Sequence, residues 1–128
     1  TILVEGDDLS DPVADQSRSI LDGHIVLSRD LSEKGIYPPI DILSSASRLI
    51  NDIVDKNQLE SIKKFRNIYA LLKENEILIR IGSYQKGSDR ELDYAIDRKT
   101  KMDKFLAQDS GKLLDFEAIC KELSEIFK

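Results

Sequence analysis

The sequence predicts an α/β segment followed by an all-α segment. Through residue 50, short apolar runs alternate with helix-forming stretches, which is typical of a parallel α/β sheet. From about residue 52, apolar residues recur at steps of three and four, the period of amphipathic helices in a bundle. We therefore divide the 128 residues into two predicted domains, 1–50 and 51–128, with the change of character near residues 49–55.

Two apolar runs in the first domain predict buried strands. Residues 2–5 form a run that stops at Gly6 and an acidic loop, and HIVLS forms a second run at 24–28. Two strands are too few to bury both faces of a parallel sheet, so we expect the rest of the sheet to lie before Thr1. The chain also opens in an apolar run without an initiator Met, and we expect it to be a piece of a longer protein.

Two short helices are predicted between and after these strands. Asp15 is placed to cap a helix that runs to about Asp22, and the following glycine is placed to stop it. Ser28 is placed to cap a second helix over RDLSEK, residues 29–34, which ends at a glycine too. A loop that contains two prolines then leads to the second domain.

The second domain begins with a long predicted helix. Asn57 and Glu60 have the spacing of a capping box, and the helix after them is predicted to run to about Asn75. A further apolar stretch, ILIRIG, closes at Gly82. A glycine directly after a periodic stretch is a typical helix stop, so we expect a turn from this position onward.

Two more helices are predicted after that turn. Ser88 and Glu91 form an S-x-x-E capping box before the first of them, and Asp115 can cap the second. Apolar residues follow a helical period in both helices. They are Leu92, Ile96, Met102 and Leu106 in the first, and Phe116, Ile119, Cys120, Leu123, Ile126 and Phe127 in the second.

The composition excludes several classes of protein. Apolar residues make up 41% and charged residues 34%, which is typical of a folded, water-exposed domain and not of a disordered chain. The net charge is −5, and the basic stretch IKKFR at 62–66 suits a solvated helix face, so we expect no nucleic-acid binding. The sequence contains no signal peptide and no apolar run of membrane-spanning length.

A single cysteine, Cys120, indicates a reducing compartment, and we expect the cytoplasm. Cys120 lies within an apolar helical pattern, while the single histidine, His24, is far away in the sequence. A catalytic thiol needs a nearby base. We therefore interpret Cys120 as a small buried hydrophobic residue.

The residues of this chain do not by themselves predict catalysis. The sequence contains no G-x-x-x-x-G-K-[ST] or G-x-G-x-x-G phosphate loop, no Cys/His cluster with zinc spacing and no G-x-S-x-G turn. The acidic loop EGDDLSDP carries Glu5, Asp7, Asp8 and Asp11, and such carboxylates can bind Mg²⁺ or Ca²⁺. The spacing does not match an EF-hand, so we favour a solvated loop in which Asp8 or Asp11 caps the backbone. A protein–protein contact through this loop stays open.

The segment GIYPPIDILSSASR, residues 35–48, combines an aromatic residue, two prolines and an arginine. The prolines directly after Tyr37 restrict the backbone on both sides of that junction. Arg48 follows a run of small residues at 44–47 that lets another subunit approach closely. Its guanidinium can bind a phosphate as a planar donor, or it can pair with a surface carboxylate, and both interpretations stay open.

These segments resemble the type III export ATPases. The resemblance rests on VEGDDLSDPVADQSRSILDGHIVLSR at 4–29, on GIYPPIDILSSASR at 35–48 and on LLKENEILIRIGSYQKGSD at 71–89. The chain resembles the flagellar members most closely. The injectisome ATPases share the same motifs, and the catalytic subunit of rotary ATP synthases has a similar segment. The resemblance implies the last strands of a RecA-like nucleotide-binding domain followed by a helical C-terminal domain.

The resemblance also implies roles for individual residues. Tyr37, supported by Pro38, stands where the family holds an aromatic ring against the adenine of ATP, and Phe116 is a candidate to complete that pocket. Arg48 stands at the family's arginine finger, which acts on the nucleotide of the neighbouring subunit. The family's phosphate loop, catalytic carboxylate and Mg²⁺-binding aspartate have no counterpart in this chain, so we expect the chain alone to be inactive and to bind ATP weakly or not at all.

The implied assembly is a hexameric ring that uses ATP and Mg²⁺ to energise protein export at the cytoplasmic face of a membrane export apparatus. Its implied partners are a central stalk protein, a negative regulator, and export chaperones or the export gate. Stalk-facing positions of the family correspond to Asp7, Asp8 and Asp11, and to the turn containing Tyr84, Lys86 and Asp89. This turn is less acidic than in rotary enzymes. The alternative function is an interaction module without catalysis of its own.

Overall fold

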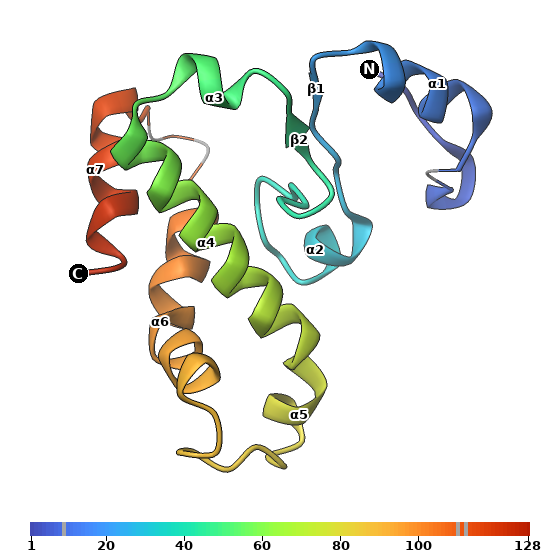
Figure 1. Cartoon of the computed structure of the whole chain (residues 1–128). Helices are drawn as coiled ribbons and strands as arrows, with labels where there is room; N and C mark the ends of the chain where they lie inside the picture. The colour runs from blue at the N-terminus through green and yellow to red at the C-terminus, as the bar shows by residue number, and fades with distance from the viewer. Residues whose placement is uncertain (9, 110, 112) are drawn as a thin grey trace. The chain divides into compact units, whose positions relative to one another are not determined.

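The computed structural model describes residues 1–8, 10–109, 111 and 113–128. The chain forms two compact units, Thr1–Ile53 and Val54–Lys128, and each is described by itself (Figure 1). The first unit contains η1 (Glu5–Asp7), α1 (Pro12–Ile20), β1 (Gly23–His24), α2 (Arg29–Glu33), β2 (Ala46–Ser47) and α3 (Ile50–Ile53). The second contains α4 (Lys56–Glu74), α5 (Glu76–Arg80), α6 (Arg90–Leu106) and α7 (Phe116–Glu125).

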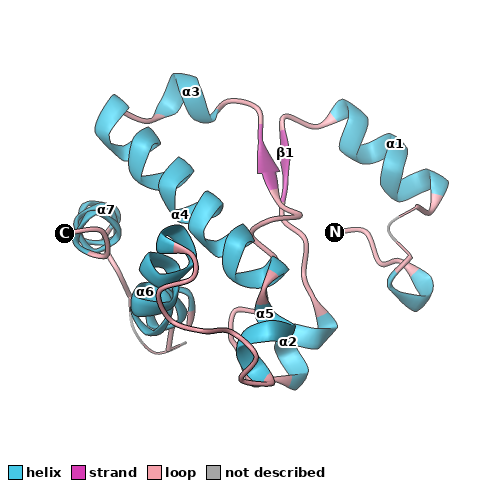
Figure 2. Cartoon of the chain, turned by 60° about the horizontal axis from the view of Figure 1, so that its bottom comes forward, coloured by secondary structure: helices cyan, strands magenta, loops and turns pink. Residues whose placement is uncertain are grey.

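The strands of the first unit differ from the prediction. β1 and β2 are two residues each and pair antiparallel, with Gly23 opposite Ser47 (Figure 2). Beyond them, the predicted strand at 24–28 contributes one isolated antiparallel bridge, from Leu27 to Ile40. Residues 1–4 form no strand, because no described segment pairs with their backbone N–H and C=O groups. The expected parallel pairing and the strand at 2–5 are therefore wrong for this unit.

The helix caps of the first unit are decided by which side chain reaches a free amide. Asp11, and not the predicted Asp15, caps α1, because its Oδ1 accepts from the amides of Val13 at 2.9 Å and Ala14 at 3.2 Å. Pro12 then occupies the first helical position, which suits its fixed φ. Ser28 caps α2 as predicted, with Oγ accepting from the amide of Leu31 at 3.4 Å.

The second unit is a small helical bundle with its core between α4, α6 and α7. In Figure 1, α6 runs beside α4, and α7 packs against α4. Phe65 stands at the centre of an aromatic group, with ring centroids of Tyr69, Phe105 and Phe127 between 5.6 and 6.3 Å away. The buried residues confirm the predicted apolar periods of the three helices, except at Phe116, which is 64% exposed. These buried residues are Phe65, Ile68, Leu72, Leu92, Ala95, Met102, Leu123 and Ile126.

Both predicted capping boxes of the second unit lie close to the real caps but are wrong. Asp55 caps α4 through the amide of Gln58 at 2.8 Å, and Asn57 lies inside the helix. Asp89 caps α6, while the hydroxyl of Ser88 donates to the carbonyl of Gln85. A carboxylate also interacts favourably with the partial positive charge of a helix N-terminus, which favours both aspartates over their neutral neighbours.

The last helix and the stop before the turn follow the prediction more closely. Asp115 occupies the N-cap position of α7, but its side chain makes no capping hydrogen bond. α4 ends at Glu74 with Asn75 as its C-cap, and Gly82 follows α5 with a φ of 70°. Cys120 was predicted to be buried, but the structure leaves it half-buried. It lies where α7 meets α4, and Nε2 of Gln58 donates to its Sγ at 3.1 Å. Among the described residues, no helix is both long and apolar enough to cross a membrane.

The corrected cap of α4 gives a first testable prediction. Replacing Asp55 with alanine is expected to lower the free energy of unfolding by about 1 kcal/mol, because the amide of Gln58 loses its acceptor. Asn57→Ala is the matched control and is expected to change stability by less than about 0.5 kcal/mol. Urea unfolding of both variants followed by circular dichroism measures the difference. A larger loss for Asn57→Ala would restore the predicted capping box.

Candidate functional site

The end of α2 determines where Tyr37 emerges. Gly35 has a φ of 73°, and its amide donates to the carbonyl of Ser32 at 3.0 Å. The amide of Ile36 reaches back to the carbonyl of Leu31 at 2.9 Å. These two hydrogen bonds form a Schellman motif, which needs a residue that tolerates positive φ. The glycine thus ends the helix and starts the loop that carries Tyr37.

The ring of Tyr37 is anchored at its edge and exposed over much of its surface. Its hydroxyl shares a 3.0 Å hydrogen bond with the hydroxyl of Ser32, and the side chain is 56% exposed. The Tyr37–Pro38 peptide bond is cis, and the carbonyl of Pro39 accepts from the amide of Ser28 at 2.8 Å. An exposed ring on an anchored loop can stack on a planar ligand at a low ordering cost.

Asp41 organises the segment between the proline loop and Arg48, a role that the sequence analysis missed. Its Oδ1 accepts from the amides of Leu43 at 3.0 Å and Ser44 at 3.1 Å, and its Oδ2 accepts from the hydroxyl of Ser44. The hydroxyl of Ser45 donates to the carbonyl of Asp41 and accepts from the amide of Val26. An aspartate followed by serines is a typical signal for such a side-chain-closed turn, so this role was available from the sequence.

Arg48 continues the β1–β2 pair by one more hydrogen bond. Its amide donates to the carbonyl of Asp22 at 2.7 Å. The two strands lie close together at Gly23, where an added Cβ would meet the carbonyl oxygen of Ala46 at 2.9 Å. Gly23, predicted as a helix stop, is therefore needed for a close backbone approach. This pairing places Arg48 directly after β2.

The guanidinium of Arg48 is exposed and only weakly engaged. Its Nη2 donates to the carbonyl of Arg18, in the last turn of α1, at 3.5 Å. A cation is favourable at a helix C-terminus, where carbonyls lack partners. Within the described residues, Arg48 forms no ion pair with a carboxylate, so the alternative of a carboxylate-paired surface arginine gains no support there.

The acidic loop near the start of the chain uses its carboxylates locally. Asp11 caps α1, and the Oδ1 of Asp8 accepts from the hydroxyl and the amide of Ser10. The hydroxyl of Ser10, followed by its amide, holds the pKa of Asp8 below its usual value. The side chain of Asp7 lies outside the described part of the chain. Among the described residues, His, Cys, Asp and Glu form no group of three or more that could hold a metal ion.

The turn between α5 and α6 is held by several hydrogen bonds. The hydroxyl of Tyr84 shares its one proton between the carbonyl of Asp89, at 3.0 Å, and Oδ1 of Asp93, at 2.9 Å. Gly87 has a φ of 95°, and its amide donates to Oδ2 of Asp93 at 2.8 Å. Lys86 pairs with Asp97 at 3.3 Å, and both side chains are largely exposed. The three predicted contact residues Tyr84, Lys86 and Asp89 thus belong to one ordered turn.

Asp93 is the second functional candidate that the sequence analysis missed. Partial burial, followed by the hydrogen bond to Asp93, raises the pKa of the Tyr84 hydroxyl. The phenol therefore stays protonated at neutral pH and remains a hydrogen-bond donor. No local pattern pairs Asp93 with Tyr84 or Gly87, because the contact joins a turn to the helix that follows it.

The other predicted residue, Phe116, lies in the second unit. It is the first residue of α7, and its side chain is 64% exposed. Tyr37 and Arg48 lie in the first unit. The role of Phe116 at an adenine ring stays a prediction.

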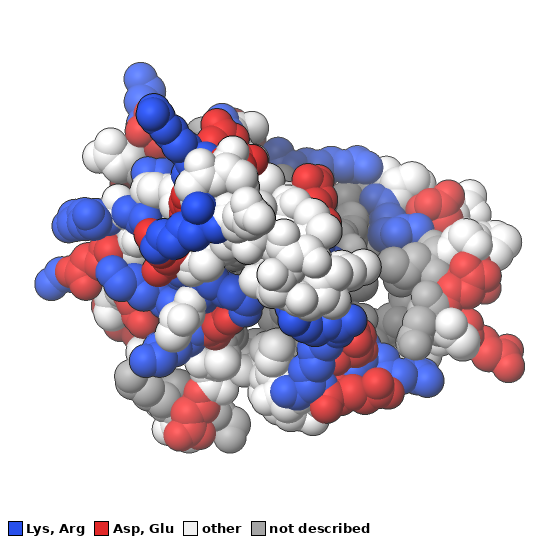
Figure 3. Space-filling model, turned by 90° about the horizontal axis from the view of Figure 1, so that it is seen from below, with Lys and Arg blue, Asp and Glu red and all other residues white. Residues whose placement is uncertain are grey.

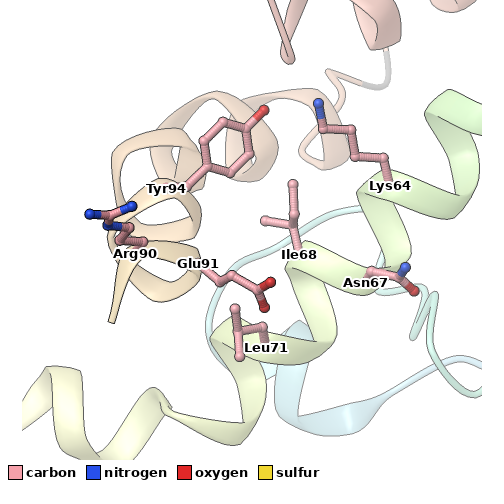
Figure 4. A pocket seen from close by; sticks show the side chains of 7 residues that line it. All are labelled: Lys64, Asn67, Ile68, Leu71, Arg90, Glu91 and Tyr94. Atoms are coloured by element: carbon pink, nitrogen blue, oxygen red, sulfur yellow. The ribbon is translucent and has the colours of Figure 1, made fainter. Parts of the chain in front are cut away.

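An open pocket of about 650 Å³ lies between α4 and α6 (Figure 4). Its wall includes Tyr94, whose ring centroid is 3.4 Å from the guanidinium carbon of Arg98 and 5.3 Å from Nζ of Lys64. It contains none of the predicted site residues. The lining residues are Lys64, Asn67, Ile68, Leu71, Arg90, Glu91 and Tyr94.

On the face shown in Figure 3, basic and acidic side chains are interspersed, so that face carries no field of a single sign.

Two family models match the chain, one for each part. The nucleotide-binding domain of the ATP synthase alpha/beta family matches residues 1–47. The C-terminal domain of the EscN ATPase of type III secretion systems matches residues 54–125. The chain belongs to the type III secretion ATPase family. The predicted fold class, the end of a nucleotide-binding domain followed by a helical domain, is confirmed by these matches.

Individual members of the family show the same likeness. The chain is 62% identical, over all 128 of its residues, to the flagellum-specific ATP synthase of Helicobacter pylori, and spans 30% of that protein. It matches the assembled ATPase EscN of enteropathogenic E. coli with a TM-score of 0.96 and 38% identity, over 100% of this chain and 31% of that one. EscN in complex with its central stalk EscO matches with a TM-score of 0.85 and 38% identity, over 91% of this chain and 29% of that one.

Proposed function

We propose that this chain is the C-terminal part of a hexameric ATPase that energises flagellar type III protein export. The observation that carries the proposal is the 62% identity to a flagellum-specific ATP synthase over the whole chain. Injectisome ATPases match at 38–44% identity, which overlaps the 43–46% of other flagellar relatives, so the flagellar system is favoured by the 62% match alone. Residues 1–50 close the nucleotide-binding domain, and residues 51–128 form the helical C-terminal domain.

In this proposal, the first domain supplies two groups to the nucleotide sites. Tyr37, on a loop anchored by Ser32 and supported by Pro38, stacks on the adenine ring of ATP. Phe116 adds an aromatic contact from the helical domain. Arg48 reaches the γ-phosphate held by the neighbouring subunit and stabilises the charge that develops there. Its exposed, weakly engaged guanidinium is what such a role requires.

We propose that the reaction needs ATP and Mg²⁺, and residues 1–128 contain no phosphate-loop motif. The chain alone is therefore proposed to be inactive and to bind ATP weakly. Turnover of ATP by an Arg48 variant of the full-length enzyme tests the catalytic part of the proposal. A loss of turnover with retained ATP binding supports it, and unchanged turnover contradicts it.

A second candidate function is docking of partner proteins by the helical domain. Two observations favour it. One is the ordered turn at 84–89, and the other is the exposed apolar residues next to it, which are Ile77 and Leu78 of α5 and Ile81 directly after α5, at 65, 47 and 62% exposure. EscN, a relative with 38% identity, forms a complex with a central stalk. We propose a stalk protein as the partner of this turn.

Further partners follow from the same proposal. We propose that the acidic loop with Asp7, Asp8 and Asp11 contributes to the stalk contact from the first domain. A negative regulator, and export chaperones or the export gate, engage the assembled ring. These partners hold the enzyme at the cytoplasmic face of the membrane export apparatus.

Substitutions in the turn test the docking function. Replacing Gln85 and Lys86 together with alanine in the full-length enzyme is expected to weaken stalk binding by about fivefold to tenfold, because two exposed contacts are truncated at the tip of the turn. Basal ATP hydrolysis without the stalk is expected to stay unchanged. Lys101→Ala, an exposed lysine further along α6, is the control. Calorimetric titration with the stalk measures the affinity, and full affinity for the double variant would remove this turn from the docking surface.

A further inference from the structure

The turn from Ser83 to Asp89 is attached to α6 by side chains that point back from the helix. Asp93 accepts two hydrogen bonds with separate oxygens, one from the hydroxyl of Tyr84 and one from the amide of Gly87. Asp97, one helical turn further, contacts the turn through the exposed amine of Lys86. The two attachments differ in kind, because Asp93 holds the backbone of the turn and Asp97 holds a flexible side chain.

The backbone attachment has a physical consequence for any partner. Gly87 inside the turn has a φ of 95°, and Gly82 directly before it has a φ of 70°, and glycine adopts such conformations without strain. A turn with one glycine inside it and another at its start has many alternative conformations, and a partner that selects one of them must offset the lost entropy. Both oxygens of Asp93 are used to limit this freedom, since each is occupied by a donor from the turn.

We propose that Asp93 is the positioning residue of the docking turn, holding it before binding in the single conformation that a stalk-like helical partner recognises. The inference rests on the docking function proposed for this turn. Asp93 need not touch the partner. It acts through Tyr84 and Gly87, whose positions it determines.

The test uses the full-length enzyme with Asp93→Ala. The amide of Gly87 is expected to exchange with solvent at least about tenfold faster, because its acceptor is lost. Affinity for the stalk protein is expected to fall about tenfold, which corresponds to about 1.4 kcal/mol. Asp97→Ala is the matched control on the same helix face and is expected to change neither quantity by more than about twofold, since an exposed ion pair contributes little.

Two further variants separate positioning from a general loss of structure. Tyr84→Phe removes one of the two donors and is expected to lower affinity by about threefold. Asp93→Asn is expected to restore most of the affinity, because its oxygen can accept from Gly87 while its amide donates to the hydroxyl of Tyr84. A variant that is merely unfolded would not be rescued by this isosteric change.

The outcomes distinguish failure of the positioning role of Asp93 from failure of the docking function of the turn. Unchanged exchange at Gly87 in Asp93→Ala overturns the positioning role. Faster exchange with unchanged affinity also overturns it, and affinity of the Gln85/Lys86 double variant then shows whether docking at the turn itself stands. Reduced affinity with faster exchange, restored by Asp93→Asn, supports both.

Discussion

Replacing Arg48 with alanine in the full-length enzyme is expected to lower ATP turnover by about 10³-fold or more while leaving ATP binding nearly intact. The reason is that an arginine finger stabilises charge that develops in the transition state and contributes little to the ground state. The guanidinium is available for this role, because its contact within the first unit is a 3.5 Å hydrogen bond to one carbonyl. Steady-state phosphate release and titration with a fluorescent ATP analogue measure the two quantities.

Two variants sharpen the test of Arg48. Arg48→Lys keeps the charge but loses the planar fork, so turnover is expected to stay well below that of the unmodified enzyme. Arg29→Ala removes another exposed arginine of the same unit and is expected to leave turnover within about twofold. If Arg48→Ala hydrolysed ATP at the unmodified rate, the finger would have to be another residue.

Replacing Tyr37 with alanine is expected to raise the KM for ATP by about 30-fold with little change in kcat. Stacking of a base on an aromatic ring contributes about 1–3 kcal/mol, and this contact is made equally in the ground state and the transition state. The 56% exposure of the side chain and the anchored hydroxyl leave the ring available for stacking. Initial rates over a range of ATP concentrations separate KM from kcat.

The role of the hydroxyl is tested separately from that of the ring. Tyr37→Phe loses the hydrogen bond to Ser32 but keeps the ring, so its KM is expected to rise by about threefold at most. Ser32→Ala removes the same hydrogen bond from the other side and is expected to match Tyr37→Phe. A KM of Tyr37→Ala equal to that of the unmodified enzyme would place the adenine against a different residue.

Local signals predicted the helical part of the chain well. The apolar period of α4, α6 and α7 is confirmed by Phe65, Leu92 and Leu123, which are all buried. Such a period depends on the geometry of one helix alone, and can be read without knowing what the helix packs against. The predicted caps at Asn57 and Ser88 are wrong, because an aspartate lies within two residues of each, and the choice depends on which side chain reaches a free amide.

Strand pairing was the largest error, and its cause is tertiary. The run at 24–28 has the composition of a buried parallel strand, yet β1 covers Gly23–His24 alone and pairs antiparallel with β2. Composition reports that a segment suits a sheet, whereas direction and register depend on the partner segment. The partner here comes from beyond the proline loop, at Ala46–Ser47.

By itself, the sequence determined the helical period of the second unit, the glycine stops before Tyr37 and Tyr84, and the resemblance to the export ATPases. All three depend on residues that are close together in the sequence. The tertiary structure alone decided that Arg48 continues β2 beside Asp22, and that Asp93 holds the turn at Gly87. Both depend on hydrogen bonds between separate segments, and their partners are chosen by the fold and not by local propensity.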